Sequence, residues 1–377
     1  MTAAPYRICT RCVMDTSDPD ITFDNAGLCN HCLRYEGLVQ KHIPTGEAAR
    51  ELLTRLIQRV QRGNERKKYD CIIGVSGGVD SSYVAYKVKE LGLRPLAVHV
   101  DNGWDSELAV KNIENLLKIL GIDLYTEVLD WEEFKDLQLA FLKASTPDSE
   151  IPTDHAIFAV LKKMAREIGV KHIIAGMNIR TETHLPAAWS QGHFDWKYIK
   201  SVHDRFGRVK LRTFPHVNLV EARLLFRDVI NLLDYLDYVK RDAMEVLEGQ
   251  LGWRYYGGKH YESIYTRFYQ GYILPKKFGY DKRRTHMSSL ICSGETTRSE
   301  ALQVLEQDSY PAALQEADRE YVIKKLGIDE TEFRAIMDAP ARSYWDYPSY
   351  GRLTRGRPYI FLRSIYRRLR SRPREEK

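Results

Sequence analysis

The sequence lacks any run of about 18 consecutive apolar residues, the length that a membrane-spanning helix needs. Its first residues, MTAAPYRICTRC, contain no apolar segment like that of a secretory signal peptide. Two common phosphate-binding motifs are also missing, the G-x-x-x-x-G-K-[ST] loop and the G-x-G-x-x-G fingerprint. We therefore expect a cytoplasmic protein that uses neither of these motifs.

Basic residues exceed acidic ones only at the C-terminal end of the chain. The 377 residues have a formal net charge of +6. Residues 351–377 contain ten Lys or Arg and two Glu, which leaves a net charge of −2 on the other 350 residues. Because nucleic-acid-binding surfaces are rich in Lys and Arg, we do not expect nucleic acid as a partner of the main body.

Cysteine is scarce, but four of the six cysteines form a regular pattern. Cys9, Cys12, Cys29 and Cys32 make two C-x2-C pairs separated by 16 residues. In a reducing compartment this spacing indicates a metal site before disulfides, and four thiolates complete a tetrahedral Zn²⁺ site. An iron–sulfur cluster and a metal-free pair of loops are the alternatives. We interpret His31, inside the second pair, as a neighbour of the site.

Short apolar segments alternate with segments of helical spacing in the middle of the chain. We expect strands at 71–75, 95–100, 123–129 and 170–176, and helices at about 81–91, 106–120, 131–144 and 155–168. This alternation predicts an α/β fold with a doubly wound parallel sheet. Ligands of such sheets bind beyond the carboxyl ends of the strands, where the strand order reverses.

Five segments are predicted along the chain. They are a four-cysteine zinc-binding module at 1–45, a connecting helix at 46–68, the α/β domain at 69–240, a helical aromatic-basic substrate region at 241–340 and a basic tail at 341–377. The tail has the pattern of a basic amphipathic helix, which could contact an anionic membrane surface or a partner. A solvated terminal helix is the alternative.

The segment SGGVDS at 76–81 lies between the first expected strand and its helix. Gly77 and Gly78 permit close approaches that a Cβ atom would prevent, and the start of the next helix offers free N–H groups to an anion. Ser76 and Ser81 add hydroxyl donors. The loop therefore has the features of a phosphate cradle, although it contains no lysine. An ordinary strand-to-helix turn is the alternative.

This loop resembles that of the PP-loop ATP pyrophosphatase superfamily. Every residue of its SGGxDS motif is matched, by Ser76, Gly77, Gly78, Val79, Asp80 and Ser81. The resemblance implies that the loop holds pyrophosphate while the α-phosphorus of ATP is attacked, a task that needs no lysine aimed at the γ-phosphate. It also implies a Mg²⁺ ion assisted by Asp80. Four residues at strand ends match positions that contact adenosine: Asp101, Asn102, Gly176 and Asn178.

A narrower resemblance extends from the cysteine module to about Asp338. The segments GVSGGVDSSY, HVDNGW, TPDSEIPTDHAI and AGMNIRTE, and the block from GGKHYESIY to TTRSEAL, look like the N-acetyl sugar amidotransferase family of bacterial lipopolysaccharide and O-antigen biosynthesis. The resemblance implies a carbon–nitrogen ligase that adenylates the N-acetyl amide of a nucleotide-activated sugar. Ammonia then displaces AMP and leaves an acetamidino sugar.

Four residues are candidates for catalysis. Asp80 lies in the loop itself. Asp154 and Glu182 follow points where the chain should approach the nucleotide, and each could bind magnesium or take a proton from ammonia; a helix cap or salt bridge is the alternative for both. Lys282 could stabilise charge that develops at the adenylated centre.

We expect ammonia to come from outside the chain. Cys9 belongs to the metal pattern, Cys71 opens a strand and Cys292 is interpreted as a small core residue, so none is placed as a glutaminase nucleophile. His184 is interpreted as structural. The family resemblance implies two separate partners, a glutaminase and an associated synthase-like subunit that supply ammonia.

Two other functions are alternatives. A tRNA-modifying, thiolase-like PP-loop enzyme would adenylate a base carbonyl, and the alternating aromatic and basic residues of 257–284 could stack on bases as well as on sugars. Such thiolases commonly carry additional catalytic cysteines, for which only Cys71 and Cys292 remain. A nonenzymatic zinc adaptor would have no need of an intact SGGVDS loop.

Overall fold

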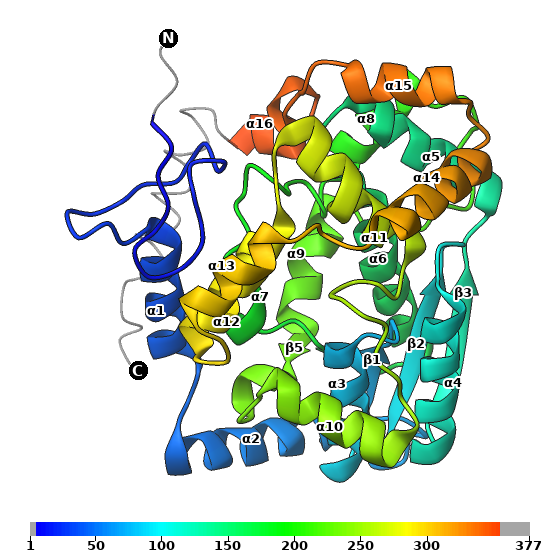
Figure 1. Cartoon of the computed structure of the whole chain (residues 1–377). Helices are drawn as coiled ribbons and strands as arrows, with labels where there is room; N and C mark the ends of the chain where they lie inside the picture. The colour runs from blue at the N-terminus through cyan, green and yellow to red at the C-terminus, as the bar shows by residue number, and fades with distance from the viewer. Residues whose placement is uncertain (1–4, 355–377) are drawn as a thin grey trace, which may run out of the picture.

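The computed structural model describes residues 5–354. A small N-terminal module lies beside a central α/β domain, and the C-terminal helices cover one end of that domain (Figure 1). The larger part of the tail predicted at 341–377 lies outside the described residues, and its described part contains α16 (Tyr350–Thr354). None of the helices in residues 5–354 combines the length and the apolar character of a membrane span.

A parallel sheet forms the centre of the α/β domain. Its strands are β1 (Cys71–Gly74), β2 (Pro95–Asp101), β3 (Asp123–Val128), β4 (His172–Ala175) and β5 (Val229–Asn231). The strand order is β3-β2-β1-β4-β5, and all pairs are parallel. The predicted doubly wound parallel sheet is therefore confirmed. Its strand order reverses between β1 and β4, next to the SGGVDS loop that leaves β1.

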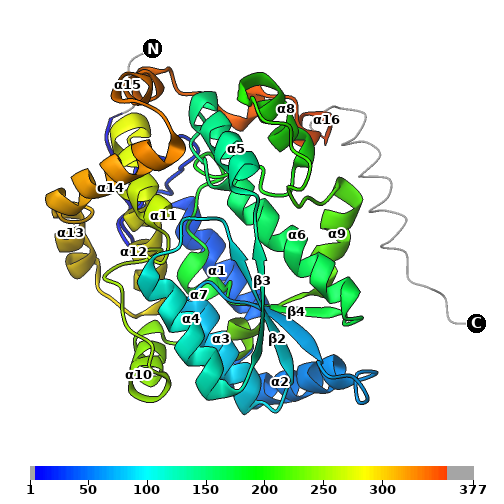
Figure 2. The ribbon, with the colours of Figure 1, turned by 90° about the vertical axis from the view of Figure 1, so that its right-hand side faces the viewer.

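Helices pack on both faces of the sheet (Figure 2). Ile73 and Ile174 point to one face, which is covered by α2 (Gly46–Gln61), α3 (Val79–Glu90), α4 (Glu107–Leu120) and α10 (Lys240–Leu251). Ile72 and Ile173 point to the other face, against α6 (Ile151–Glu167). Because successive residues of a strand point to opposite faces, strands covered on both sides consist almost wholly of apolar residues.

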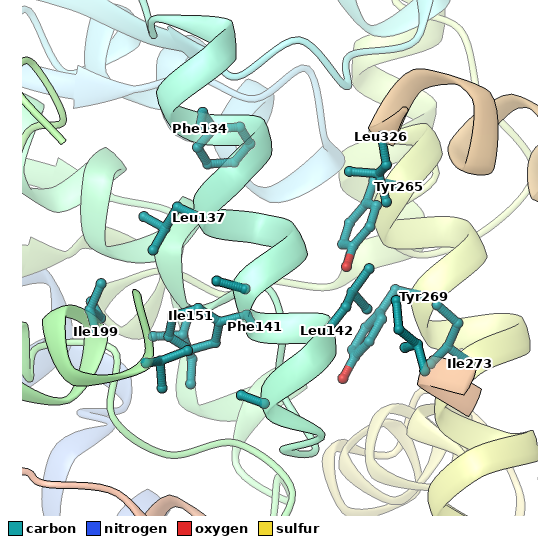
Figure 3. Packing of buried hydrophobic residues seen from close by; sticks show 14 of the residues in the cluster. Phe134, Leu137, Phe141, Leu142, Ile151, Ile199, Tyr265, Tyr269, Ile273 and Leu326 are labelled. Carbon is teal, nitrogen blue, oxygen red and sulfur yellow. The ribbon is translucent and has the colours of Figure 1, made fainter. Parts of the chain in front are cut away.

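A further helical layer packs beyond α6. It consists of α5 (Trp131–Ala144), α8 (Trp196–Phe206), α11 (Ile264–Phe268), the π-helix η2 (Tyr269–Phe278), α14 (Ala312–Leu326) and α15 (Glu330–Asp338). Tyr265, Phe268 and Tyr269 are buried in its core, where Tyr265 and Tyr269 face side chains of α5 (Figure 3). These three rings of the aromatic-basic block therefore belong to the core and are not surfaces for a sugar or a base.

The predicted helices and strands are present, with some changes at their ends. The connecting helix predicted over 46–68 is shorter, because α2 ends at Gln61 and a turn follows. The helix predicted from 155 begins four residues earlier, at Ile151, with Pro152 in its first turn, where proline is favourable. The strand β5 and the short helices α7 (Ile179–Glu182) and α9 (Leu219–Asp228) were not predicted.

The N-terminal module docks on the C-terminal helices through two arginines. Arg284 of α12 (Lys282–Ser293) donates to the carbonyl of Val13 at 2.9 Å and pairs with Asp15 at 3.1 Å. Arg298, which begins α13 (Arg298–Glu306), donates to the carbonyl of Cys9 at 3.1 Å. The module also contains α1 (Asn30–His42), which contacts α7 and α12.

Candidate active site and metal centre

The loop at 76–81 is closed by its own hydroxyl groups. The Oγ atoms of Ser76 and Ser81 lie 3.1 Å apart. Ser76 Oγ accepts from the backbone N–H of Gly78 at 3.3 Å, and Ser81 Oγ donates to the carbonyl of Gly78 at 3.2 Å. Val79 begins α3 and is buried, so the N-terminus of this helix is fixed directly behind the loop. The arrangement agrees with the predicted anion cradle.

Two glycines fit this loop into the fold. Gly77 has a φ of +79°, and a Cβ on it would lie only 2.7 Å from the carbonyl oxygen of Ala109. Its own carbonyl accepts from Nε1 of buried Trp253 at 2.8 Å. Gly176, after β4, would carry a Cβ only 3.0 Å from the backbone of Asp80. Both positions therefore require glycine, because another residue would push the loop out of place.

The other predicted adenosine contacts lie at the same edge of the sheet. Asp101 Oδ1 accepts from the backbone N–H two residues later at 2.8 Å, and Asn102 Oδ1 does so at 3.1 Å. Asn178 Oδ1 caps α7 by accepting from the N–H of Thr181 at 2.9 Å. These side-chain oxygens shape the turns after β2 and β4, and contact with adenosine remains a prediction for them.

Cationic side chains from distant segments surround the loop. Tyr238 donates a hydrogen bond to Oδ1 of Asp80. Lys240, two residues later, is close enough to Asp80 for their charges to interact. Its pKa is lowered, because the effect of burial exceeds the opposing effect of the Asp80 charge. Lys259 Nζ lies 3.3 Å from Glu182 Oε1. The loop has no lysine of its own, but the fold brings two lysines to its surroundings.

Glu262 lies directly over the loop. Its Oε1 atom would be 3.2 Å from a Cβ placed on Gly78, and it lies 3.4 Å from Nδ1 of His260. The pKa of Glu262 is lowered overall. Burial alone would raise it, but the hydrogen bond and charge of His260 outweigh burial. Lys240 belongs to none of the motifs singled out in the sequence. Glu262 lies in GGKHYESIY, but it was not selected as a site residue.

Asp154 and Lys282 lie in a second polar cluster. Asp154 Oδ2 lies 2.9 Å from Nδ1 of His193, and Lys282 Nζ lies 3.8 Å from Glu150 Oε2. The pKa of Asp154 is lowered overall. Burial alone would raise it, but the hydrogen bond and charge of His193 outweigh burial. The charges of Lys282 and His260 lower it further. His260 thus links this cluster electrostatically to Glu262. The four predicted catalytic residues thus fall into two groups, Asp80 and Glu182 around the loop and Asp154 and Lys282 in the second cluster. His193 was not selected from the sequence.

A cavity of about 630 Å³ adjoins the second cluster. Its wall includes Trp189, whose ring stacks on Tyr280 with centroids 4.8 Å apart and an interplanar angle of 13°. The indole N–H of Trp189 is buried and has no hydrogen-bond partner within residues 5–354. Asp148 also lines the cavity, and its Oδ2 lies 3.8 Å from Nε2 of His193. Asp148 therefore lies between the cavity and His193.

The four predicted metal ligands meet in the N-terminal module. Cys9 and Cys32 have their Sγ atoms 3.9 Å apart, Cys12 and Cys29 have theirs 3.6 Å apart, and all four residues are fully buried. Tetrahedral zinc with bonds of about 2.3 Å places its sulfurs about 3.8 Å apart, so the four residues fit the ion. His31 Nε2 instead contacts Asp18 Oδ2 at 2.6 Å, and its interpretation as a neighbour agrees with this contact.

Residues 262–359 match the family model described as "LPS biosynthesis protein WbpG-like, C-terminal domain". The tRNA-specific 2-thiouridylase MnmA of Clostridioides difficile is 30% identical over 193 residues, which cover 46% of this chain and 49% of that protein. The chain is thus similar in part to MnmA, and residues 262–359 are similar to the WbpG-like C-terminal domain. Glu262 and Lys282 belong to the WbpG-like segment, and both lie in the clusters described above.

Another relative is the uncharacterized protein MJ1599 of Methanocaldococcus jannaschii, which is 27% identical over 171 residues, 45% of this chain and 58% of that protein. This chain thus spans about half the length of these two relatives. Among solved structures, NMN synthetase from Francisella tularensis covers 73% of this chain and 96% of its own, with 16% identity and a TM-score of 0.33. A likeness at this level says nothing about function.

The four-cysteine site is expected to retain one tightly bound zinc per chain after dialysis against metal-free buffer. Because folding of a small metal-held module draws on metal binding, Cys29→Ser should lower the zinc content and the melting temperature. Elemental analysis and thermal unfolding measure the two effects. Cys71→Ala, which changes a cysteine in β1, should keep its zinc. Iron in place of zinc would contradict this assignment.

The pKa of His193 should fall in an Asp154→Asn variant. Burial lowers this pKa, and the hydrogen bond and charge of Asp154 more than offset burial and raise it. The ion pair should therefore stabilise the folded protein at pH values below the ordinary histidine pKa of about 6.5, as long as Asp154 is ionised. This stabilisation is lost as the pH rises through the raised pKa of His193 in the folded protein. NMR titration of ¹⁵N-labelled histidine rings measures the shift.

The exposed residue Asp242 of α10 supplies the control, because Asp242→Asn removes the same charge away from His193. An unchanged His193 titration in Asp154→Asn would show that the two side chains do not form this pair in solution.

Proposed function

We propose that the protein is an ATP-dependent amidotransferase of bacterial surface-polysaccharide (O-antigen) biosynthesis. It adenylates the N-acetyl amide of a nucleotide-activated sugar and replaces the amide oxygen with ammonia, giving an acetamidino sugar. One observation carries the proposal: Glu262, from the WbpG-like segment, lies over Gly78 of the PP-loop. The segment that resembles a lipopolysaccharide biosynthesis protein therefore lies against the loop that we propose to bind ATP. We place the reaction in the cytoplasm, where ATP is available.

The loop and its surrounding cations suit a reaction that releases pyrophosphate. The N–H groups at the start of α3 can hold phosphate oxygens, while Lys240 and Lys259 can offset the charge of the leaving pyrophosphate. Asp80 uses only Oδ1 for Tyr238, so Oδ2 remains to hold Mg²⁺. When bound, Mg²⁺ would neutralise phosphate charge.

The second cluster suits the transfer of nitrogen. In the first step, the amide oxygen of the sugar attacks the α-phosphorus of ATP, and pyrophosphate leaves. In the second, ammonia adds to the amide carbon, a proton leaves the nitrogen, and AMP departs with the former amide oxygen. Asp154, kept ionised by His193, can accept the proton, and Lys282 can stabilise the charge on the departing AMP.

The cavity beside this cluster is the proposed place of the nucleotide sugar. The stacked rings of Trp189 and Tyr280 supply an aromatic wall for a sugar. Burial lowers the pKa of Lys277, also in the wall, to about 8. A sugar held there would lie against Asp148, which is next to His193 and Asp154.

A tRNA-modifying enzyme is the second candidate, supported by the likeness to the MnmA protein. Thiolases of that kind use reactive cysteines near the nucleotide. Cys71 is buried in β1, and burial raises the pKa of its thiol, so it is a poor nucleophile. Cys292 lies 3.8 Å from Cys32, a residue of the metal centre. These positions favour the amidotransferase.

The reaction should release AMP and pyrophosphate in equal amounts when the pure protein receives ATP, Mg²⁺, ammonium and an N-acetylated nucleotide sugar. Asp80→Asn should reduce turnover by more than about tenfold, because the neutral side chain is a weaker Mg²⁺ ligand. Phosphorus NMR identifies the products. Asp242→Asn, on the exposed side of α10, should keep full turnover. ADP as the main product would contradict the pyrophosphate-releasing reaction.

Glutamine should not replace ammonium unless partner proteins are added. We propose that a separate glutaminase, with a synthase-like subunit, supplies ammonia to this chain, because Cys9 is a metal ligand and Cys71 is buried in a strand. Product formation with glutamine is compared before and after the partners are added, with ammonium salt as the positive control. Efficient use of glutamine by the pure chain would refute the need for a partner.

A further inference from the structure

A second group of metal-binding side chains lies beside the four-cysteine site. Its members are Cys32 in α1, His184 just after α7, and Cys292 near the end of α12. Cys292 Sγ lies 3.8 Å from Cys32 Sγ and 3.6 Å from His184 Nε2, and the three ligand atoms all lie within 4.8 Å of one another. The spacing of the two sulfurs matches that of ligands sharing one tetrahedral ion.

The hydrogen bonds of His184 direct one ring nitrogen toward these sulfurs. Ser289 Oγ donates to the carbonyl of Thr285 at 3.1 Å, so it accepts from Nδ1 of His184 at 3.0 Å. This network assigns the proton to Nδ1 and leaves the lone pair of Nε2 turned toward Cys292. Metal-binding histidines are held in the same way, with the second ring N–H donated to a protein acceptor.

The charge of the metal centre also favours a second cation. A zinc ion with four thiolates has a formal charge of about −2, and this charge is buried in the module. A second divalent ion that shares Cys32 and adds the thiolate of Cys292 brings the total to about −1. Burial of the smaller net charge costs less.

We propose that Cys32, His184 and Cys292 form a second transition-metal site, in which the Cys32 thiolate bridges two ions. Two thiolates and an imidazole select soft or borderline ions such as Zn²⁺ and Co²⁺ over Mg²⁺ and Ca²⁺. Three protein ligands leave one position of a tetrahedral ion open to water or a small ligand. The second ion should therefore be held less tightly and exchange more readily than the zinc of the four-cysteine site.

The site joins three segments that lead to the candidate active site. His184 follows Glu182 by two residues, and Cys292 lies in the helix that begins with Lys282. Cys32 belongs to the N-terminal module, which is also held by Arg284 and Arg298 and by Arg34, which donates to the carbonyl of Thr183. An ion bound at all three would fix α1, α7 and α12 relative to one another and thereby hold Glu182 and Lys282 in position.

The test is a titration with Co²⁺ of the full-length protein that retains one zinc per chain after dialysis against metal-free buffer. We expect one equivalent of Co²⁺ to bind without release of zinc and to produce thiolate-to-cobalt absorption bands. Cys292→Ser and His184→Gln should each weaken this binding by more than about tenfold while they keep the first zinc. His31→Gln is the matched control, because His31 also lies beside the four-cysteine site but is paired with Asp18. It should bind Co²⁺ like the unmodified protein.

Zinc content and thermal unfolding of each variant establish that it is folded, and His184→Gln serves if Cys292→Ser fails to fold. Three results would each overturn the proposal. The first is no binding of Co²⁺ to the zinc-loaded protein, which would mean that Cys292 only donates a hydrogen bond to His184. The second is cobalt bands matched by an equal release of zinc. The third is undiminished binding in both variants.

Discussion

The site depends on the close approach of the PP-loop to its neighbours. Gly77 packs against the backbone of α4, and Gly176 packs against the backbone at Asp80. The backbone of the loop is therefore held in place by α4 and by the segment after β4, as well as by β1, from which it continues. Trp253 adds a hydrogen bond to the carbonyl of Gly77 from beyond α10. A loop held from three sides keeps its N–H groups aligned before any ligand arrives, which reduces the free-energy cost of ordering on binding.

The charges around this loop come from segments that are far apart in the sequence. Lys240 begins α10, Lys259 and Glu262 lie in the segment before α11, and Glu182 ends α7. A lysine within the loop would have a fixed place in a motif, whereas these cations reach the site only when the C-terminal segment folds back over the sheet. Of these residues Glu262 belongs to the WbpG-like segment, and it lies beside Gly78, so the proposed site combines the loop with that segment.

Local patterns in the sequence predicted the sheet, the loop and the four-cysteine centre, because each depends on residues that are close together along the chain. The catalytic roles of Asp154 and Lys282 stay predictions. The contacts of Asp154 with His193 and of Lys282 with Glu150 join segments far apart in the chain, so local patterns could not predict them. Tyr265 was interpreted as a possible stacking surface, but its ring is buried. Aromatic residues at helical spacing look alike in a core and in a binding surface, so burial could not be predicted from the pattern.

The metal centre has a structural task that follows from the small size of its module. The buried apolar cluster there consists of Met14 and the four cysteines, with partly buried neighbours that include Cys292. Such a core is too small to fold without additional bonds, so metal–sulfur bonds must supply much of the stability. The module in turn supports α12 through Arg284 and α13 through Arg298, and α12 carries Lys282. Loss of zinc should therefore disturb the active site through the position of this helix, even though none of the four cysteines takes part in the proposed reaction.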